Sequence, residues 1–368
     1  LMASCIKDEA PNAEADITSI SFEEDILANS YIDLNPSYDE SQNAYPIRIS
    51  VKEGTDKKLA PIFELTPGPT ISPANGSVQD FTTSVRYTVT SEDKAWHRVY
   101  AITVREQKAS NIPTTYHFEK VRIMQNVWQE FYEEQDSGNE LTWASGNKGF
   151  KWAMSEAATE DYPTTQIDNG KTGKCVKLET RLTGDLGNMV GMPIAAGNLF
   201  IGSFDMQNAI TNPLSATRFG TPFYNKPLRL TGYYKYKAGE QFYENGEYTS
   251  RKDIFNIYAI FYDGVKYDSA GKGTDVTLDG NLPNQNYEHS SMVALALVSN
   301  PQETEGDEWK FFDIPFDYQR YGKKIDEARL AKGEYKIGII FASSKDGATF
   351  EGAPGSTLLI DEVELIYE

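Results

Sequence analysis

The chain has 368 residues, with 35 Lys and Arg against 54 Asp and Glu, and its formal charge is −19. This charge repels a phosphate backbone, and no basic cluster offsets it, so nucleic acid is excluded as a partner. No apolar stretch reaches the roughly 20 residues that span a bilayer, and 12% aromatic residues are too many for a disordered acidic chain. Because single cores stop growing at roughly 250–300 residues, two domains are expected.

The N-terminus carries a processing pattern. Leu1-Met2-Ala3-Ser4-Cys5 resembles the end of a bacterial lipoprotein signal, in which small residues precede a cysteine that is acylated after cleavage. Ile6-Lys7-Asp8-Glu9 is similar to the signal that sends lipoproteins of the Bacteroidetes to the cell surface. The resemblance implies lipidation at Cys5, a signal remnant and tether over residues 1–16, and a lipid-anchored protein on the outer membrane, at the cell surface. The alternative is an ordinary N-terminus with an accidental cysteine.

From residue 17 to 107, apolar and polar residues alternate in short runs between turn residues. Tyr45, Ile47, Ile49 and Val51 form one such run, and this period of two predicts a small β-sandwich. The segment 67–90 is also similar to the immunoglobulin-like domains of surface proteins in gut Bacteroidetes, which implies that this domain is a spacer. The alternation is lost over residues 105–113, and we place the domain boundary there.

Residues 113–368 alternate again, and their strongest predicted strands lie at 228–236, 254–262, 292–298, 336–341 and 358–367. Only residues 323–332 favour a short helix. Strands joined by loops that contain Gly, Asn and Pro predict a jelly-roll sandwich, so the whole chain is expected to be all-β. In the last strand, Leu359, Val363, Leu365 and Tyr367 are predicted to face the core.

A series of motifs occurs in order across residues 115–368: Trp143–Asn147, Gly197–Phe204, Phe219–Phe223, Pro227–Tyr236, Ser343–Gly347, Phe350–Gly352 and Gly355–Leu358. The series resembles the putative carbohydrate metabolism domain of Bacteroidetes surface lipoproteins. The resemblance implies a jelly roll similar to carbohydrate-binding modules and to jelly-roll glycoside hydrolases, with a role connected to glycans. It implies no established reaction.

Saccharide recognition uses flat aromatic rings against the C–H faces of a sugar and planar polar groups for its hydroxyls. Trp152 and Trp143 are candidate platforms, with core or loop packing as the alternative. The candidate ligand-binding residues lie on or beside the motifs above: Trp143, Asn147, Arg218, Lys235, Asp253, Ser344, Lys345 and Glu351.

Enzyme and metal signatures are scarce. The three histidines are scattered, and the sequence has no nucleophile elbow, His-Glu-x-x-His, phosphate loop or dinucleotide fingerprint. Cys175 lies in an alternating stretch and is predicted to be a buried, inert thiol. No cofactor is expected. Asp361 interrupts the core face of the last strand, and a buried carboxylate needs a partner or a metal, so a structural Ca²⁺ stays open as an alternative.

Three hypotheses follow. In the first, the chain is a cell-surface lipoprotein that binds an oligo- or polysaccharide in a pocket on the concave face of its jelly roll, and contacts the membrane only through Cys5. In the second, the same cleft is that of a glycoside hydrolase or polysaccharide lyase, with Asp253, Glu351 or Glu362 as acids. The third is a structural adhesin. Two facing carboxylates in one aromatic-lined cleft would favour the enzyme, and aromatics without such a pair would favour binding.

Overall fold

The computed structural model describes residues 13–368, so the predicted lipidation site, Cys5, lies outside the described residues. The chain divides into two compact units, one that ends at Ala109 and one from Ser110 to Tyr367. No helix in the described range combines the length and the apolar character that a membrane span requires.

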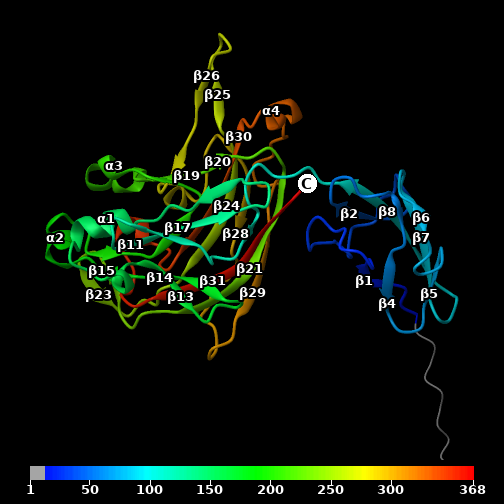
Figure 1. Ribbon diagram of the computed structural model, residues 1–368, viewed down its shortest axis with the longest axis horizontal. Coiled ribbons are helices and arrows are strands. Elements are labelled where there is room, and N and C mark those ends of the chain that lie inside the picture. The colour runs from blue at the N-terminus through cyan, green and yellow to red at the C-terminus, as the bar shows by residue number, and fades with distance from the viewer. Residues whose placement is uncertain (1–12) are drawn as a thin grey trace, which may run out of the picture. The chain divides into compact units, whose positions relative to one another are not determined.

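The first unit is an immunoglobulin-like β-sandwich, as predicted (Figure 1). Its strands are β1 (Ile17–Ser21), β2 (Tyr45–Val51), β3 (Lys58–Leu59), β4 (Ile62–Leu65), β5 (Thr70–Ser72), β6 (Gln79–Asp80), β7 (Val85–Thr90) and β8 (His97–Glu106). The main sheet has the order β2-β8-β7-β5, in which β2 runs parallel to β8. The alternating residues Ile47, Ile49 and Val51 are buried, because successive side chains of a strand point to opposite faces.

The second unit is a jelly-roll sandwich of two antiparallel sheets, which confirms the predicted all-β class. The first sheet, called here the β31 sheet, consists of β9 (Thr115–Tyr116), β13 (Thr164–Asp168), β14 (Lys174–Glu179), β21 (Pro227–Lys237), β29 (Lys310–Pro315) and β31 (Thr357–Tyr367). The second, called here the β30 sheet, consists of β17 (Asn198–Phe200), β20 (Thr221–Pro222), β24 (Asn256–Asp263), β28 (Met292–Leu297) and β30 (Tyr335–Ala342).

Shorter elements surround the two sheets. The further strands are β10 (Val121–Met124), β11 (Trp128–Glu134), β12 (Glu140–Thr142), β15 (Arg181–Leu182), β16 (Ile194–Ala195), β18 (Gly202–Phe204), β19 (Thr217–Phe219), β22 (Phe242–Glu244), β23 (Glu247–Thr249), β25 (Val265–Tyr267), β26 (Gly273–Asp275) and β27 (Leu278–Asp279). The helices are α1 (Asn147–Ala153), α2 (Gly184–Met189), α3 (Met206–Thr211) and α4 (Glu327–Ala331), with 3₁₀ turns η1 (Thr159–Asp161), η2 (Pro213–Ser215), η3 (Pro283–Gln285) and η4 (Gly347–Thr349).

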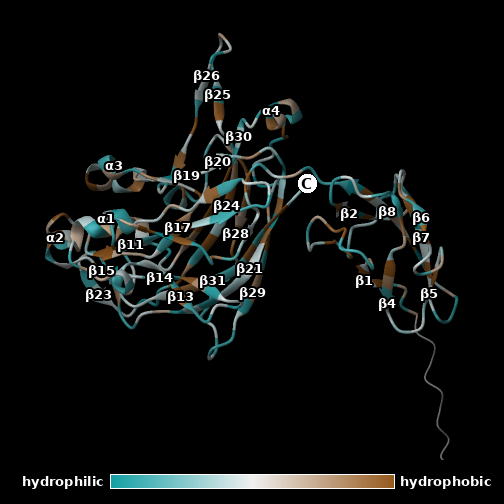
Figure 2. Ribbon diagram, viewed as in Figure 1, coloured by the Kyte–Doolittle hydropathy of each residue, from teal (hydrophilic) through white to brown (hydrophobic). Residues whose placement is uncertain are grey.

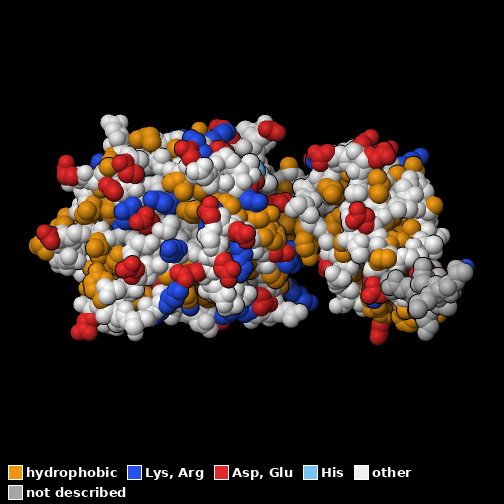
Figure 3. All heavy atoms as spheres, turned by 90° about the horizontal axis from the view of Figure 1, so that it is seen from below, with side chains coloured by type: hydrophobic (Ala, Val, Ile, Leu, Met, Phe, Trp, Pro, Cys, Tyr) orange, Lys and Arg blue, Asp and Glu red, His pale blue; other side chains and the backbone are white. Residues whose placement is uncertain are grey.

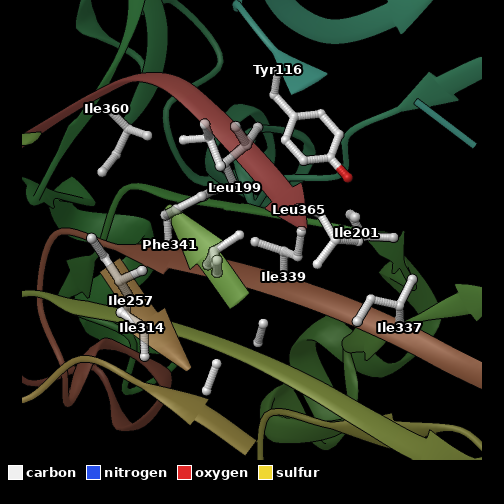
Figure 4. Close-up of a cluster of buried hydrophobic side chains, with 14 of the residues drawn as sticks. Tyr116, Leu199, Ile201, Ile257, Ile314, Ile337, Ile339, Phe341, Ile360 and Leu365 are labelled. Carbon is white, nitrogen blue, oxygen red and sulfur yellow. The ribbon is translucent and has the colours of Figure 1, made fainter. Parts of the chain in front are cut away.

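The main core lies between the β31 and β30 sheets. Ile257 and Ile339 of the β30 sheet belong to the same buried cluster as Ile360 and Leu365 of β31, and Figure 4 shows these side chains together. In Figure 2 the sheet strands show brown residues among white and teal ones, and many of the connecting loops are hydrophilic. Burial of large aliphatic and aromatic side chains on both sheets is the main favourable contribution to folding of this unit.

The alternation in the last strand predicts the wrong face for one residue, Leu359. Leu359 is half-buried and lies outside the core cluster, whereas Leu358 and Ile360 are buried in it. A β-bulge explains the change of face: Glu362 has a φ of 48°, and the register between β31 and β21 shifts at this point. The extra residue switches the inward-facing set from even to odd positions, so Val363 is again in the core.

The helices also differ from the prediction. Helix α4 lies within the predicted range 323–332, but the expectation that it would be the only helix is wrong, because α1, α2 and α3 also form. Each is seven residues or fewer. They lie together at one end of the second unit (Figure 1), where α1 contacts both α2 and α3.

Candidate functional site

The outer face of the β30 sheet carries the candidate site. Side chains that point away from the main core, including Tyr258, Ile260 and Ile340, form a second and smaller apolar cluster on this face. Next to this cluster, on the side of α1, α2 and α3, the sheet borders a cavity of about 180 Å³.

The floor of the cavity is made by three neighbouring strands. The strand register aligns its residues in two rows across β17, β30 and β24, namely Phe200–Ile340–Tyr258 and Asn198–Ala342–Asn256. The first row is aromatic and aliphatic. In the second row, two amides flank the small side chain of Ala342. An apolar row beside a polar row matches the two kinds of surface that a sugar ring presents.

Hydrogen bonds fix the orientation of both floor amides. Asn198 Oδ1 accepts a hydrogen bond of 2.7 Å from the Gly146 N–H, and Asn256 Nδ2 donates to the Tyr287 hydroxyl at 2.9 Å. The other two amide atoms, Asn198 Nδ2 and Asn256 Oδ1, form no hydrogen bond within the described residues. The row therefore presents one donor and one acceptor, oriented before any ligand binds.

The walls of the cavity come from the three short helices. Phe150 and Trp152 of α1, Val190 after α2, and Met206 and Ile210 of α3 all line it. The Trp152 side chain is 38% exposed, so part of its ring is open to solvent. The walls therefore supply an accessible aromatic surface close to the oriented amides.

Lys345 is the one charged residue among the described residues that line the cavity. It is exposed and forms no ion pair with the described part of the chain. No Asp or Glu from the described residues appears in the lining, although acidic residues outnumber basic ones in the chain. This composition excludes a pair of carboxylates facing each other across this cavity.

Of the predicted site residues, Ser344 and Lys345 line the cavity. The Ser344 hydroxyl points inward, since it donates to Asp253 Oδ2 at 2.6 Å. Asp253 itself is 2% exposed and also accepts from the Ser356 hydroxyl at 2.7 Å and from the Ala353 N–H at 2.8 Å. Burial raises the pKa of the Asp253 carboxyl, and these hydrogen bonds oppose the rise. Asp253 thus anchors the loop that follows β30.

The structure places Trp143 and Asn147 in the interior. The Trp143 ring is 1% exposed and packs edge-to-face on Tyr116, with centroids 5.0 Å apart, so its faces are covered by protein. Asn147 is fully buried. Its side chain exchanges two hydrogen bonds with the backbone of Thr164, of 2.8 and 3.1 Å, which ties the start of α1 to β13. Neither side chain lines this cavity.

The other predicted residues lie outside this cavity. Arg218 is an exposed residue of β19, and Glu351 follows η4 without entering the lining. Lys235 belongs to the β31 sheet, where its ammonium group pairs with Asp307 at 2.6 Å and lies 5.0 Å from the centroid of the Trp309 ring. The structure therefore does not bring these three side chains together with Lys345.

Two further sequence interpretations concern isolated groups. Cys175 is fully buried, and burial raises the pKa of its thiol to about 12, so it stays protonated and unreactive at neutral pH. Asp361 is also fully buried, and its carboxylate accepts from the backbone N–H groups of Thr172 and Glu362 at 3.0 and 2.8 Å. Within residues 13–368, no three His, Cys, Asp or Glu side chains are grouped as metal ligands would be.

Sequence reasoning missed the floor residues. Asn256 and Tyr258 lie in a correctly predicted strand, and the signal was available: Asn256 is a polar residue within an apolar run and shares its face with Tyr258. Asn198 lies inside a motif that was identified, but nothing in the sequence indicates that it is two strands away from Asn256. That proximity follows from the strand order β17-β30-β24.

Comparisons with known proteins agree with this architecture. A family model described as "Putative carbohydrate metabolism domain" matches residues 117–366, and a second, described as "SGBP, N-terminal", matches residues 32–104. A crystal structure of a putative glycoside hydrolase from Bacteroides vulgatus ATCC 8482 is 50% identical, with a TM-score of 0.65, and the match covers 71% of this chain and all of that one.

A second crystal structure, of a putative glycoside hydrolase from Bacteroides thetaiotaomicron VPI-5482, is 45% identical, with a TM-score of 0.63. That match covers 98% of this chain and 99% of the other. A comparison with curated proteins found no match.

Proposed function

The chain belongs to the putative carbohydrate metabolism domain family, and from this premise we propose that it binds a glycan in the cavity on the outer face of the β30 sheet, without cleaving it. The family description and both similar structures connect this fold with carbohydrates. The observation that carries the proposal is the pair of floor rows, in which aromatic and aliphatic side chains lie beside two amides held in fixed orientations.

The chemistry of the lining supports saccharide binding in particular. Trp152, which is 38% exposed, offers apolar ring surface for the C–H face of a sugar, and the free atoms of Asn198 and Asn256 offer a donor and an acceptor for neighbouring hydroxyls. Lys345 adds a charged donor at the rim. Because the amides are already oriented, little conformational entropy is lost when a ligand binds.

The lining also argues for binding over hydrolysis. Glycoside hydrolysis by the common mechanisms needs two carboxyl groups, about 5–5.5 Å apart for retention or about 6.5–9.5 Å for inversion. Of the acids considered from the sequence, Asp253 is occupied by structural hydrogen bonds, and neither Glu351 nor Glu362 is among the lining residues. The described part of the chain therefore offers no acid–base pair to a glycan in this cavity.

The proposal is tested with the full chain on a glycan array, followed by an assay for released reducing ends on every glycan that binds. We expect binding without release. Release of reducing ends would overturn the proposal in favour of a hydrolase, and binding to no glycan would favour a structural adhesin.

Two variants connect the binding to this cavity. Trp152→Ala and Lys345→Ala are each expected to weaken binding about fivefold or more, since each removes one ring or one charged donor. Trp96→Ala is the matched control for the tryptophan, because Trp96 is 57% exposed and belongs to the first unit. Lys266→Ala, at an exposed position of β25, is the control for the lysine. Unchanged binding in both cavity variants would place the glycan elsewhere.

We also propose that Cys5 carries a lipid that holds the protein at the cell surface. The support is the resemblance of Leu1–Cys5 to the end of a lipoprotein signal. Two or more acyl chains give stable anchoring. Metabolic labelling with an alkyne fatty acid is expected to mark the wild type and not Cys5→Ala, whereas Cys175→Ala should label normally. Equal labelling of the wild type and Cys5→Ala would contradict this assignment.

A further inference from the structure

A second cavity, of about 330 Å³, shares Phe204 with the first one. Its lining comes from the end of β10 and the turn after it, from β11, from the end of β12 and the segment that follows it, from α1 and from β18. Both cavities belong to the second unit, and the residues between Ser145 and Gly149 contribute to both linings. Nothing in the function proposed above uses this second cavity.

The cavity lies where the chain passes from one sheet to another. The Trp143 N–H donates to the Phe131 carbonyl of β11 at 2.8 Å, while the next residue, Ala144, exchanges two backbone hydrogen bonds of 2.9 Å with Phe200 of β17. Trp143 and Ala144 both line the cavity. These two consecutive residues are therefore held by different sheets. Backbone hydrogen bonds thus fix the part of the cavity wall that they form.

Three aromatic side chains border this hollow. Trp128, Trp143 and Phe204 all line it, and the two tryptophans are 7% and 1% exposed. Neither indole N–H has a hydrogen-bond partner within the described residues. Both N–H groups are closed off from solvent, so the two indoles form the wall of the hollow and are not donors to a ligand in it.

Two charged side chains of the lining have no partner within residues 13–368. Glu130 is half-buried, and within residues 13–368 its carboxylate forms neither a hydrogen bond nor an ion pair. Burial raises the pKa of the Glu130 carboxyl, and the positive charge of Arg122, its cross-strand partner, lowers it in part. Lys148 of α1 also lines the cavity, and it is exposed and unpaired within the same range. A carboxylate acceptor and an ammonium donor thus stand beside aromatic rings.

We infer that this second cavity is a saccharide subsite, so that the chain binds an oligosaccharide whose units occupy both cavities, with Phe204 as their shared wall. The inference rests on the proposed function. A neutral sugar unit fits the lining best, because its hydroxyls satisfy Glu130 while an acidic unit is repelled by that carboxylate. Among the described residues that line either cavity, Glu130 is the only carboxylate, so the subsite binds without supplying an acid–base pair.

The first test is a crystal of the full chain soaked separately with D-glucose, D-galactose, D-mannose and D-xylose. We expect sugar density in the second cavity, in contact with Glu130, for at least one of the four. Density in the first cavity alone, or in neither, would overturn the inference. Density in the second cavity alone would support the inference while contradicting the site assigned under the proposed function.

The second test uses a length series of whichever array-positive glycan binds, beginning with the monosaccharide. Glu130→Gln and Lys148→Ala are each expected to raise the dissociation constant of the longer oligosaccharides about fivefold, as the loss of one charged hydrogen bond would. The affinity for the monosaccharide should fall in the same variants wherever the soaked crystals show it in the second cavity. The matched controls are Glu247→Gln and Lys266→Ala, at exposed positions of β23 and β25. Wild-type affinity of both variants at every length would overturn the inference.

Discussion

Asp253 is an acidic residue in the middle of the family-like motifs, but its surroundings give it a role in stability. Its carboxylate accepts hydrogen bonds from two serine hydroxyls, of Ser344 and Ser356, and from the N–H groups of Ala353 and Ile254. Three of these bonds are to Oδ2 and one is to Oδ1. Because Asp253 is 2% exposed, neither oxygen is open to a substrate.

Asp253→Ala is therefore expected to lower the free energy of unfolding by about 3 kcal/mol, because it leaves buried hydroxyl and amide donors without an acceptor. Urea unfolding followed by tryptophan fluorescence measures the change. Asp307→Ala is the matched control: the Asp307 carboxylate is fully exposed in its pair with Lys235, and losing it should leave the free energy of unfolding nearly unchanged. Equal effects of the two substitutions would contradict the anchoring role.

Asp361 gives a prediction with a definite pH dependence. Burial raises the pKa of this carboxyl from 3.8 to about 6, although two backbone N–H groups oppose the rise. A folded-state pKa above the unfolded value means that the folded protein holds the proton more tightly. The stabilising contribution of the protonated Asp361 carboxyl is complete below the unfolded pKa, and it is lost as the pH rises through about 6.

Asp361→Asn removes this titration. The difference in unfolding free energy between the variant and the wild type should shift in favour of the variant by about 2–3 kcal/mol between about pH 4 and pH 7. Urea unfolding of both proteins at several pH values measures it, and the titration of all other groups cancels in the difference. A difference that does not change with pH would show that Asp361 titrates normally.

Strand β31 illustrates what the sequence can predict and what it cannot. Its alternation correctly predicts a long strand with one core face, since Val363, Leu365 and Tyr367 are buried. It fails for Leu359, because the bulge at Glu362 shifts the phase by one residue. A bulge is set by the register with the neighbouring strand β21, and that information lies more than a hundred residues away in the chain.

The bulge predicts that two substitutions at Glu362 differ in their effect on stability, because its positive φ costs a side-chain-bearing residue about 1–2 kcal/mol. Glu362→Gly removes this cost and loses only a partly exposed contact with His117 at 3.1 Å, so its stability should stay within about 1 kcal/mol of the wild type. Glu362→Val should destabilise by about 2 kcal/mol, because a β-branched residue tolerates a positive φ poorly. Thermal unfolding compares the three proteins. A valine variant as stable as the wild type would contradict the assigned backbone conformation.

The short helices explain why the candidate site was only partly predictable. Helices α1, α2 and α3 have too few residues to show a helical period, and helices of this length are marginal without tertiary contacts. Helix α1 lacks a side-chain N-cap, and it is held instead by Asn147, which bonds to Thr164 of β13. The sequence indicated the strand carrying Asn256 and the loop carrying Lys345. The walls, including the position of Trp152, depend on packing that only the folded chain defines.

The molecule as a whole has a charge of −19, whereas its first cavity is lined by a single charged residue from the described range, Lys345. On the face seen in Figure 3, acidic and basic side chains are interspersed. The predicted fold class, an all-β chain with an immunoglobulin-like sandwich followed by a jelly roll, is confirmed. It succeeded because composition and alternation are properties of long segments, to which a local bulge or a short helix contributes little.

This charge distribution predicts how binding responds to salt. A neutral glycan interacts with the cavities through ring contacts and short hydrogen bonds, which added salt screens very little, so its affinity should change by less than about twofold between low and high ionic strength. A uronate- or sulfate-bearing glycan is repelled by the net negative charge at long range, and salt screens that repulsion. Its affinity should therefore rise with salt. Isothermal titration at two ionic strengths with one neutral and one acidic glycan from the array measures both effects, and an acidic glycan whose binding weakens steeply with salt would instead indicate recognition by a cluster of basic side chains.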